Sequence, residues 1–426
     1  MIRQYFKQAW RILKENPVLS IITILGTALS ICMIMVQVMT ENVKYGHLPP
    51  ETKRDRMLMV TVASVKVTHK NGYNQNWSPF GLKLVKELFE PMTTCETVGF
   101  FSSGPNMPIS VPGLEESVVP STKYCSEGYW KFFDYNFIDG APFSESDVRS
   151  GTKKAVISRT VAEKVFGDVD VVGRTFQFFG DEVFQVCGVV EPVSVLARYA
   201  NAGMWIPYTS TKVIMDKRDE ISGNFIVMIL AKSRKDFKKI RAEVASMIEK
   251  RANHDPNTEI DIYSQPDTYR LSTYREPEFN EEKIDYSAKF RKSFLLYLLF
   301  LLVPAINLGL MTNSRMSQRA HEIGVRRCYG ATRPNILWQV VWESFLFTLL
   351  GSILGLILSV GGVYSFQKVL FKGFDFERLH LSLWDYLQPR VLLMAIVFCL
   401  LLNLVSAIIP AIQYAKSNII RNLYNE

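Results

Sequence analysis

The sequence predicts a membrane α-helical protein with four transmembrane helices. A large mixed α/β extracytoplasmic domain, here called the large domain, is expected between helices 1 and 2. A helix needs about 20 mostly apolar residues to cross the hydrocarbon core of a bilayer, and four stretches of the 426-residue chain meet this requirement. Roughly 250 more polar residues separate the first two stretches, enough for a folded domain. The apolar stretches are Val18 to Met39, Ser293 to Met311, about Ser344 to Val363, and Val391 to Ile412.

The first apolar stretch follows basic residues and could be a signal peptide. It is longer than the roughly 7 to 15 apolar residues of a signal sequence, and no cleavage site of the small-x-small type follows before Glu41. We therefore expect a retained membrane anchor. Residues 1–16 predict an interfacial helix ahead of it, with an irregular basic tail as the alternative. The helix is favoured because four residues share one face at helical spacing: Tyr5, Ala9, Ile12 and Leu13.

The net charge of +8 comes entirely from the membrane part of the chain. Residues 41–292 hold 34 Lys plus Arg against 34 Asp plus Glu, and the remainder holds 15 basic and 7 acidic residues. This distribution argues against a nucleic-acid partner. Because Lys and Arg of short loops stay in the cytoplasm, it also predicts that both termini are cytoplasmic. The orienting residues are Arg3, Lys7, Arg11, Lys14, Arg315, Arg319, Arg326, Arg327, Arg333, Lys416 and Arg421.

Together these observations predict the order of segments along the chain. The expected segments are a cytoplasmic interfacial helix (1–16), a first transmembrane helix (17–40), the large domain (41–290), a second transmembrane helix (291–313), a cytoplasmic loop (314–336), a third transmembrane helix (337–365), a short outer loop (366–390), a fourth transmembrane helix (391–412) and a cytoplasmic tail (413–426).

Strands and helices are predicted to alternate in the large domain, which indicates a mixed α/β fold. We expect strands at 57–68, 155–158, 224–231 and 259–263, and a hairpin of 174–179 with 182–190 about Gly180-Asp181. Helices are expected at 78–89 with Ser78 as N-cap, at 160–166, and from Ser233 to about Arg251. Residues 266–277 are expected to form a polar connector. A long helix is expected from about Glu281 into the second span.

Several enzyme classes are argued against by absent motifs. No G-x-x-x-x-G-K-[ST] sequence is present, so the chain should not hydrolyse ATP by itself, and we expect no catalytic residues. No His or Cys pair has metal-ligand spacing, so no metal site is expected. Three cysteines are predicted outside the membrane. A Cys95–Cys125 disulfide is possible, while Cys187 lies in an apolar strand-like run and should pack as a small apolar residue.

The cytoplasmic loop from Arg315 to Arg333 has more features than a positively charged connector requires. It combines an apolar pair, Ile323 and Val325, with arginines and with glycines at 324 and 330. Two short helices broken near Gly330 would present an apolar knob ringed by arginines. Such a knob could dock into a groove of another protein.

This loop resembles the E-I-G-x-R-[RK]-x-x-G-A-T-R segment of FtsX-like, MacB-type permeases of ABC transporters. Segments 129–140 and 156–190 resemble the periplasmic domain of the same family. The resemblance implies that 291–426 is an FtsX-like permease domain and that the loop engages a cytoplasmic ATPase. The coupling residues would be Glu322, Ile323, Gly324, Val325, Arg326, Arg327, Gly330, Ala331, Thr332 and Arg333.

Two further features lie in the third predicted span. Gly351, Gly355 and Ser359 form a stripe of small residues that allows close helix packing, either within the chain or in a dimer. Glu343 lies near the cytoplasmic end of the span. It is a candidate intramembrane charge, with an interfacial residue paired to a loop arginine as the alternative.

The family resemblance implies an inner-membrane, multi-pass subunit of a bacterial ABC transporter that works as a dimer with a second copy or a paralogue. ATP and Mg²⁺ would bind a separate ATPase subunit, and this chain would bind no cofactor. Export of peptides, antibiotics or lipoproteins is implied, often with a periplasmic adaptor and an outer-membrane channel. The alternative is an FtsX-like signalling permease that activates cell-wall hydrolases or senses antimicrobial peptides. The segment Asn418 to Leu423 departs from the family's proline-containing ending, so tail contacts with the ATPase are in doubt.

Overall fold

The computed structural model describes residues 17–275 apart from 71, 113–116, 179 and 181. It also describes residues 332–366 and scattered residues between 287 and 330 and between 389 and 401. The chain divides into two compact units. The membrane unit comprises 1–43, 285–373 and 382–426, and the large domain comprises 44–284 and 374–381.

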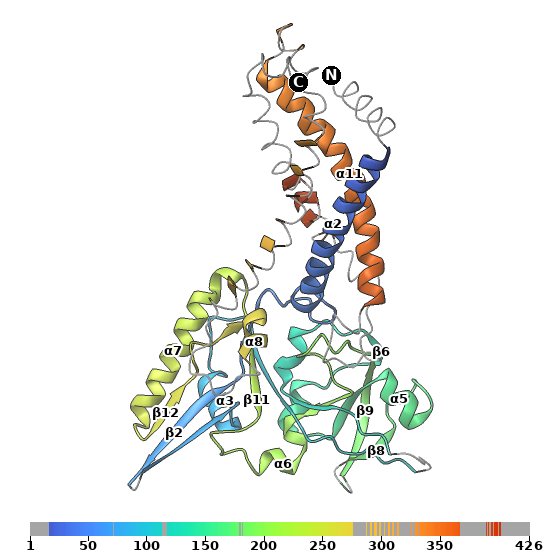
Figure 1. Ribbon diagram of the computed structural model, residues 1–426. Helices are drawn as coiled ribbons and strands as arrows, with labels where there is room; N and C mark the ends of the chain where they lie inside the picture. Colours follow the sequence, from blue (N-terminus) through green and yellow to red (C-terminus); the bar gives the residue numbers. More distant parts are fainter. Residues whose placement is uncertain are drawn as a thin grey trace. The chain divides into compact units, whose positions relative to one another are not determined.

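A ten-stranded mixed sheet forms the centre of the large domain (Figure 1). Its strand order is β13-β1-β11-β4-β5-β10-β7-β9-β6. The tenth strand, β8, is outside this linear order and pairs with β9. The pairs β5–β10 and β7–β9 are parallel, whereas the other pairs along the path are antiparallel. The strands are β1 (Met57–Val60), β4 (Thr97–Ser103), β5 (Thr122–Cys125), β6 (Phe137–Gly140), β7 (Lys154–Ser158), β8 (Thr175–Phe178), β9 (Glu182–Val190), β10 (Met204–Pro207), β11 (Phe225–Leu230) and β13 (Asp267–Thr268).

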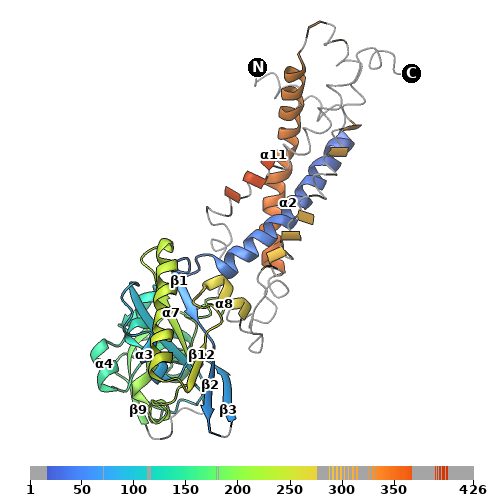
Figure 2. The same ribbon diagram turned by 90° about the vertical axis from the view of Figure 1, so that its left-hand side faces the viewer.

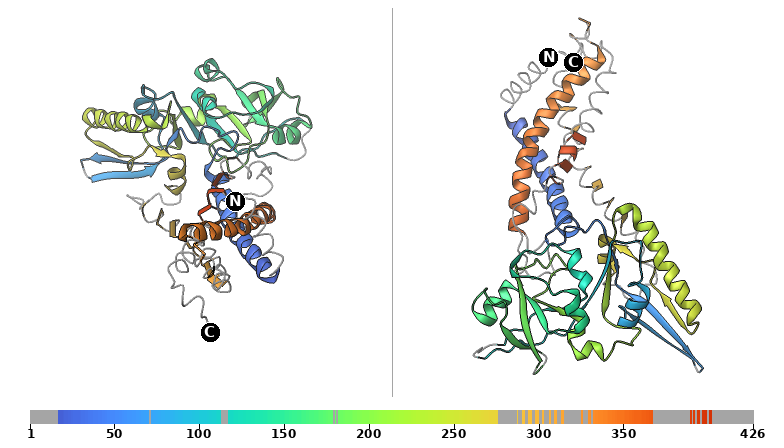
Figure 3. Two further views of the ribbon diagram at one scale, coloured as in Figure 1. Left: turned by 90° about the horizontal axis from the view of Figure 1, so that it is seen from above. Right: turned by 180° about the vertical axis from the view of Figure 1, so that it is seen from behind.

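A smaller antiparallel sheet of order β12-β2-β3 lies at the end of the domain that carries α7, while α5 lies at the other end (Figures 1 and 3). The hairpin of β2 (Ala63–His69) and β3 (Gly72–Ser78) lies at one edge of the domain (Figure 2), and β12 is Thr258–Asp261. The helices are α3 (Leu82–Leu88), α4 (Glu145–Ser150), α5 (Arg159–Phe166), α6 (Lys212–Met215), α7 (Phe237–His254) and α8 (Tyr269–Arg275), with 3₁₀ turns at Glu127–Phe132, Tyr208–Ser210 and Arg234–Asp236.

The core of the large domain is rich in aromatic side chains. Tyr129, Trp130, Tyr135 and Trp205 form a cluster of edge-to-face and tilted rings with centroid separations of 5.3 to 6.3 Å. The hydroxyl of Tyr129 accepts a hydrogen bond from the indole nitrogen of Trp205 at 3.2 Å. Segments 129–140 and 156–190 supply much of this core, as expected of aromatic and aliphatic core positions.

Several local predictions for the large domain are confirmed. The capping box of Ser233 and Asp236 starts the 3₁₀ turn that leads into α7. The predicted helix at 160–166 is α5, which Ser158 caps and which ends at Gly167 with a left-handed φ of 73°. The hairpin about residue 180 is the antiparallel pair β8–β9.

Three other predictions are wrong. The helix expected from Ser78 begins only at Leu82 with Gly81 as N-cap, because Phe80 forms bridges with strand β11 and its neighbourhood. The strand expected at 57–68 is divided into β1 and β2, which belong to different sheets. The polar connector expected at 266–277 contains β13 and α8, which an ion pair between Arg275 Nε and Asp267 Oδ2 at 2.7 Å joins.

The possible Cys95–Cys125 disulfide is absent, because both thiols are free. Cys125 pairs with Phe101 on strand β4. Four strand residues, about 13 Å, separate Phe101 from Thr97, and Cys95 lies beyond Thr97. A disulfide requires Cα atoms no more than about 7 Å apart, so these two positions cannot be bridged in this fold.

Two helices in the described part of the membrane unit are long and apolar enough to span a membrane. They are the segment Ser20–Tyr45 of α2 (Pro17–Tyr45) and the segment Phe347–Ser365 of α11 (Arg333–Ser365). The two helices run side by side (Figures 1 and 3). The predicted interfacial helix 1–16 and the tail 413–426 lie outside the described residues, and the second and fourth predicted spans fall on scattered ones.

Candidate functional site

The candidate coupling segment is described at four positions just before α11 and at the first residue of that helix. The backbone N–H of Tyr329 donates to the carbonyl of Val325 at 3.1 Å, which closes one helical turn. Gly330 follows with a φ of 91°, a conformation that glycine adopts at little cost. Thr332 is then extended and acts as N-cap of α11, which has proline in its first turn. The break lies near Gly330 as predicted, but the helix that follows it is the 33-residue α11 and not a short one.

Tyr329 adds to the apolar surface of this segment. Its side chain is 89% exposed and that of Val325 is 36% exposed. Tyr329 lies four residues after Val325 and so shares its helical face. That spacing could have identified Tyr329 from the sequence. The remaining predicted coupling residues lie outside the described residues: Glu322, Ile323, Gly324, Arg326, Arg327 and Ala331.

Helix α11 begins at Arg333, four residues before the predicted start of the third span at 337. Its 33 residues form one unbroken helix, about 50 Å long at 1.5 Å per residue. The candidate coupling segment is therefore followed directly by the membrane helix. Glu343 lies in α11 ahead of the apolar segment Phe347–Ser365, and its role remains a prediction.

Two glycines of α11 lie against α2. A Cβ atom added to Gly351 would lie 2.7 Å from Cβ of Thr27, and one added to Gly355 would lie 2.6 Å from the carbonyl oxygen of Ala28. Both distances are shorter than van der Waals contact, so only glycine fits without a shift. Ser359 is fully buried, and its hydroxyl donates to the carbonyl of Leu356 at 2.7 Å.

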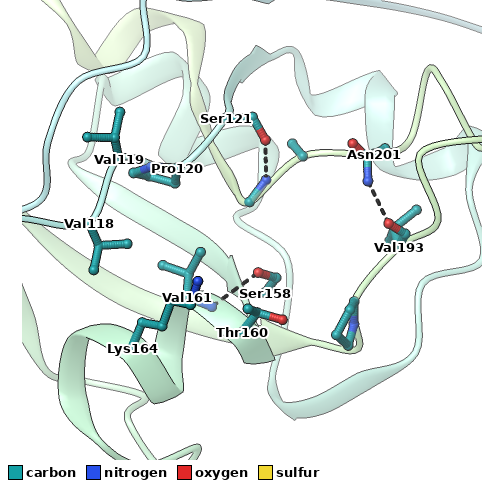
Figure 4. Close-up of a pocket in the computed structure, with 13 residues that line it drawn as sticks. Val118, Val119, Pro120, Ser121, Ser158, Thr160, Val161, Lys164, Val193 and Asn201 are labelled. Atoms are coloured by element: carbon teal, nitrogen blue, oxygen red, sulfur yellow. Dashed lines mark hydrogen bonds between the residues drawn. The ribbon is translucent and has the colours of Figure 1, made fainter. Parts of the chain in front are cut away.

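A cleft of about 300 Å³ opens in the large domain beside the first turn of α5 (Figure 4). Val119 and Val161 provide aliphatic walls, and Lys164 of α5 lies at one side. The amide nitrogen Nδ2 of Asn201 donates to the carbonyl of Val193 at 2.5 Å, which ties together two segments of the wall. In the described parts of the chain no group of three His, Cys, Asp or Glu side chains could hold a metal ion.

A buried ion pair lies just after α2. Arg54 Nε and Glu51 Oε2 are 2.7 Å apart, and the two side chains are 1% and 0% exposed. Oε1 of Glu51 accepts hydrogen bonds from the backbone N–H groups of Tyr199 and Ala200 at 2.7 and 2.8 Å. Burial of a charged pair is costly unless such bonds satisfy it. Sequence reasoning missed this pair, because its partners lie almost 150 residues away.

Lys123 of β5 is a second buried cation. Its Nζ donates to the carbonyls of Arg198 and Tyr199 at 3.0 and 2.6 Å and lies 4.6 Å from the centre of the Phe101 ring. Loss of hydration lowers the pKa of Lys123 from 10.5 to about 8. The nearby Glu51 carboxylate acts in the opposite direction and keeps this pKa from falling further.

Two family profiles match the chain. The profile of the MacB-like periplasmic core domain matches residues 20–247, and that of the FtsX-like permease C-terminal region matches residues 294–419. The first covers more than half of the chain.

Several curated proteins are similar to the chain. The uncharacterized ABC transporter permease YknZ of Bacillus subtilis is 24% identical over 312 residues, which are 73% of this chain and 72% of that protein. The pyoverdine export ATP-binding/permease protein PvdT of Pseudomonas syringae pv. tomato is 22% identical over 373 residues, 83% of this chain and 50% of that protein. The macrolide export ATP-binding/permease protein MacB of Bdellovibrio bacteriovorus is 27% identical over 241 residues, 55% and 34% of the two chains. The chain thus spans about half the length of PvdT.

Two solved structures resemble parts of the chain. The extracellular domain of the noncanonic ABC-type transporter YknZ from Gram-positive bacteria is 18% identical, covers 42% of this chain and 86% of its own, and has a TM-score of 0.32. The periplasmic region of MacB from Actinobacillus actinomycetemcomitans is 16% identical, covers 51% and 94%, and has a TM-score of 0.34.

Proposed function

Because the chain belongs to the family of ABC transporter permeases that join a MacB-like periplasmic core domain to an FtsX-like permease domain, we propose that it works by mechanotransmission. A separate cytoplasmic ATPase would hydrolyse ATP and move the coupling segment 322–333. The membrane helices would pass this movement to the large domain. Two permease subunits would act together, as two copies or as a pair of paralogues, with both termini in the cytoplasm.

The observation that carries this proposal is the shape of the coupling segment. The exposed side chains of Val325 and Tyr329 form an apolar knob on one helical turn. Three residues, beginning with the left-handed Gly330, separate this knob from α11. An apolar anchor in an arginine-rich segment of the sequence suits a groove on a soluble partner, because aromatic and arginine side chains dominate the affinity of such contacts. Because this connection is short, a movement of the knob should be passed on to α11.

We propose that the cargo is exported from the extracytoplasmic side, as the names of PvdT and MacB state for those proteins. Peptides, antibiotics or lipoproteins are the cargo classes that we expect, with a periplasmic adaptor and an outer-membrane channel as further partners. The large domain carries no net charge between 41 and 292, so electrostatics favours no particular cargo.

The first test is affinity purification of the tagged full chain from detergent-solubilised membranes. We expect an ATPase subunit with a P-loop to co-purify and the eluate to hydrolyse ATP. Gly324→Trp, Tyr329→Ala, or Arg326→Glu combined with Arg327→Glu should release the ATPase. Lys217→Glu combined with Arg218→Glu reverses two exposed charges of the large domain and should retain it.

Each result of this purification supports or refutes one of the proposals. Retention of the ATPase by all coupling-segment variants would refute the assignment of that segment. Recovery of an adaptor and an outer-membrane channel with the ATPase would support export. Recovery of a cell-wall hydrolase in their place would instead support a signalling permease.

A further inference from the structure

A loop of five residues, Leu196 to Ala200, lies at the centre of a polar network in the large domain and is buried except at Arg198. It is called the buried loop here. Six side chains from four parts of the chain bind its backbone, so it is tied to much of the domain at once. These side chains are Glu51, Arg54, Lys123, Tyr129, Tyr135 and Tyr269.

The segment that follows α2 is one of those attached to the buried loop. Arg54 Nη2 donates to the carbonyl of Leu196 at 2.7 Å, and Nη1 donates to the carbonyls of Lys44 and Gly46 at 3.2 and 2.9 Å. Lys44 lies in the last turn of α2, where the carbonyl groups lack helical partners and favour a cation. One guanidinium group therefore joins the end of α2 to the buried loop, and Glu51 holds it in place.

Helix α8, which leads toward the second predicted span, is attached to the same loop. The hydroxyls of Tyr199 and Ser272 are 2.7 Å apart, and Ser272 is fully buried. The hydroxyl of Tyr269 donates to the carbonyl of Leu196 at 3.4 Å. The guanidinium carbon of Arg54 lies 4.4 Å from the centre of the Tyr269 ring, which adds a cation–π contact between the two connections.

Residues that flank the buried loop form part of the wall of the cleft in Figure 4. Val193 and Asn201 flank the loop and are hydrogen-bonded to each other. Gly203, two residues further on, donates to the carbonyl of Ser121 on the opposite wall at 2.8 Å. A displacement of the buried loop must therefore alter this wall or break its hydrogen bonds.

We propose that the buried loop couples both membrane connections of the large domain to the cleft, with Glu51, Arg54, Tyr199 and Ser272 as its positioning residues. The inference rests on the proposed mechanotransmission function, because a movement of α2 or of the second span is what it would pass on. The cleft would then change shape when the ATPase binds or hydrolyses ATP.

Hydrogen exchange of the full chain in detergent tests the physical link without the ATPase. Tyr199→Phe removes only the hydroxyl that reaches α8, and Tyr208→Phe removes a hydroxyl from another buried tyrosine as the matched control. Loss of one such bond should speed exchange up to about tenfold, both in α8 and in residues 201–203. Faster exchange confined to the loop itself, or the same pattern in Tyr208→Phe, would overturn the inference.

A second variant tests the link between the end of α2 and the buried loop. Glu51→Gln combined with Arg54→Met removes both charges together, which avoids leaving one buried charge unpaired. Glutamine retains an oxygen that can accept from the N–H groups of Tyr199 and Ala200. Exchange should rise at the end of α2 and at 201–203 but stay unchanged in β3. Unchanged exchange at 201–203 would count against the link.

The functional link is measured with the co-purified ATPase and a thiol probe in the cleft. Val119→Cys places a half-exposed thiol in the cleft wall, whereas burial raises the pKa of native Cys187 to about 12 and keeps it unreactive. ATP with vanadate should change the labelling rate of Val119→Cys several-fold, and Tyr199→Phe should remove most of this change while ATPase binding persists. A full response in Tyr199→Phe would refute the coupling.

Failure of any ATPase to co-purify would instead refute the proposed function, and hydrogen exchange alone would then decide the inference.

Discussion

The buried Lys123 predicts an unusual dependence of stability on pH. Its pKa is about 8 in the folded chain and 10.5 in the unfolded chain. As pH rises above 8, the folded state releases this proton while the unfolded state still binds it, so the free energy of unfolding increases up to about pH 10. At 1.36 kcal/mol per pH unit, the full effect is about 3 kcal/mol. Above pH 10 the gain should reverse, because burial raises the pKa of Tyr199 to about 12.

Lys123→Met removes this titration and should flatten the rise between pH 8 and pH 10. At pH 7 the variant loses the cost of the buried charge. It also leaves the carbonyl of Arg198 without its lysine donor, which costs about 1 to 3 kcal/mol. The slope with pH is therefore the informative quantity, rather than the stability at any one pH.

Urea unfolding of the full chain in detergent, followed by tryptophan emission, measures this slope. Trp205 pairs with Lys123 across the parallel strands β5 and β10 and reports on the same region. The matched control is Lys83→Met, which removes an exposed lysine of α3 and should leave the rise intact. A wild-type chain whose stability is flat from pH 8 to pH 10, or a Lys123→Met chain that rises as steeply, would refute the reasoning.

Three further predictions concern single positions. Gly355→Leu should separate α2 from α11 and lower the thermal stability of the detergent-solubilised chain, whereas Gly361→Leu, where nothing lies within 4 Å of the added Cβ, should not; equal melting temperatures would contradict the packing argument. Gly330→Ala should strain the residue before α11 by about 1 to 3 kcal/mol and weaken co-purification of the ATPase, and undiminished recovery would show that the φ of 91° is not needed. Ser144→Ala removes the capping box of α4 and should destabilise the large domain by about 1 kcal/mol in urea; an unchanged unfolding midpoint would be inconsistent with this cap.

Local signals made the helices with strong caps predictable. Ser233 and Asp236 begin the helical segment that contains α7, and Ser158 and Gly167 delimit α5, because each of these ends depends on residues close in the sequence. Strand β3 was not predicted. Its residues are almost all exposed, so they show no apolar alternation. Helix α8 was missed for a similar reason, since a buried ion pair and not an apolar stripe attaches it.

The candidate sites also differ in how far the sequence alone could predict them. The coupling segment could be recognised because its residues are contiguous, and the glycines of α11 because their spacing is helical. Loop 196–200 could not be recognised. Its partners Glu51 and Tyr269 lie more than 70 residues away on either side, and no spacing rule connects such positions. They meet only in the folded domain.

The length of α11 has a geometric consequence. The apolar segment Phe347–Ser365 accounts for its last 19 residues, so about 20 Å of rigid helix precede it at 1.5 Å per residue. A helix of this length would act as a lever when it tilts in the bilayer. A tilt of only five degrees about the middle of a 50 Å rod moves each end by about 2 Å. Gly351 and Gly355 lie about 3 and 9 Å from that midpoint, so the same tilt moves them by less than about 1 Å. The ends of α11 can therefore move while its close contacts with α2 at these glycines stay almost unchanged.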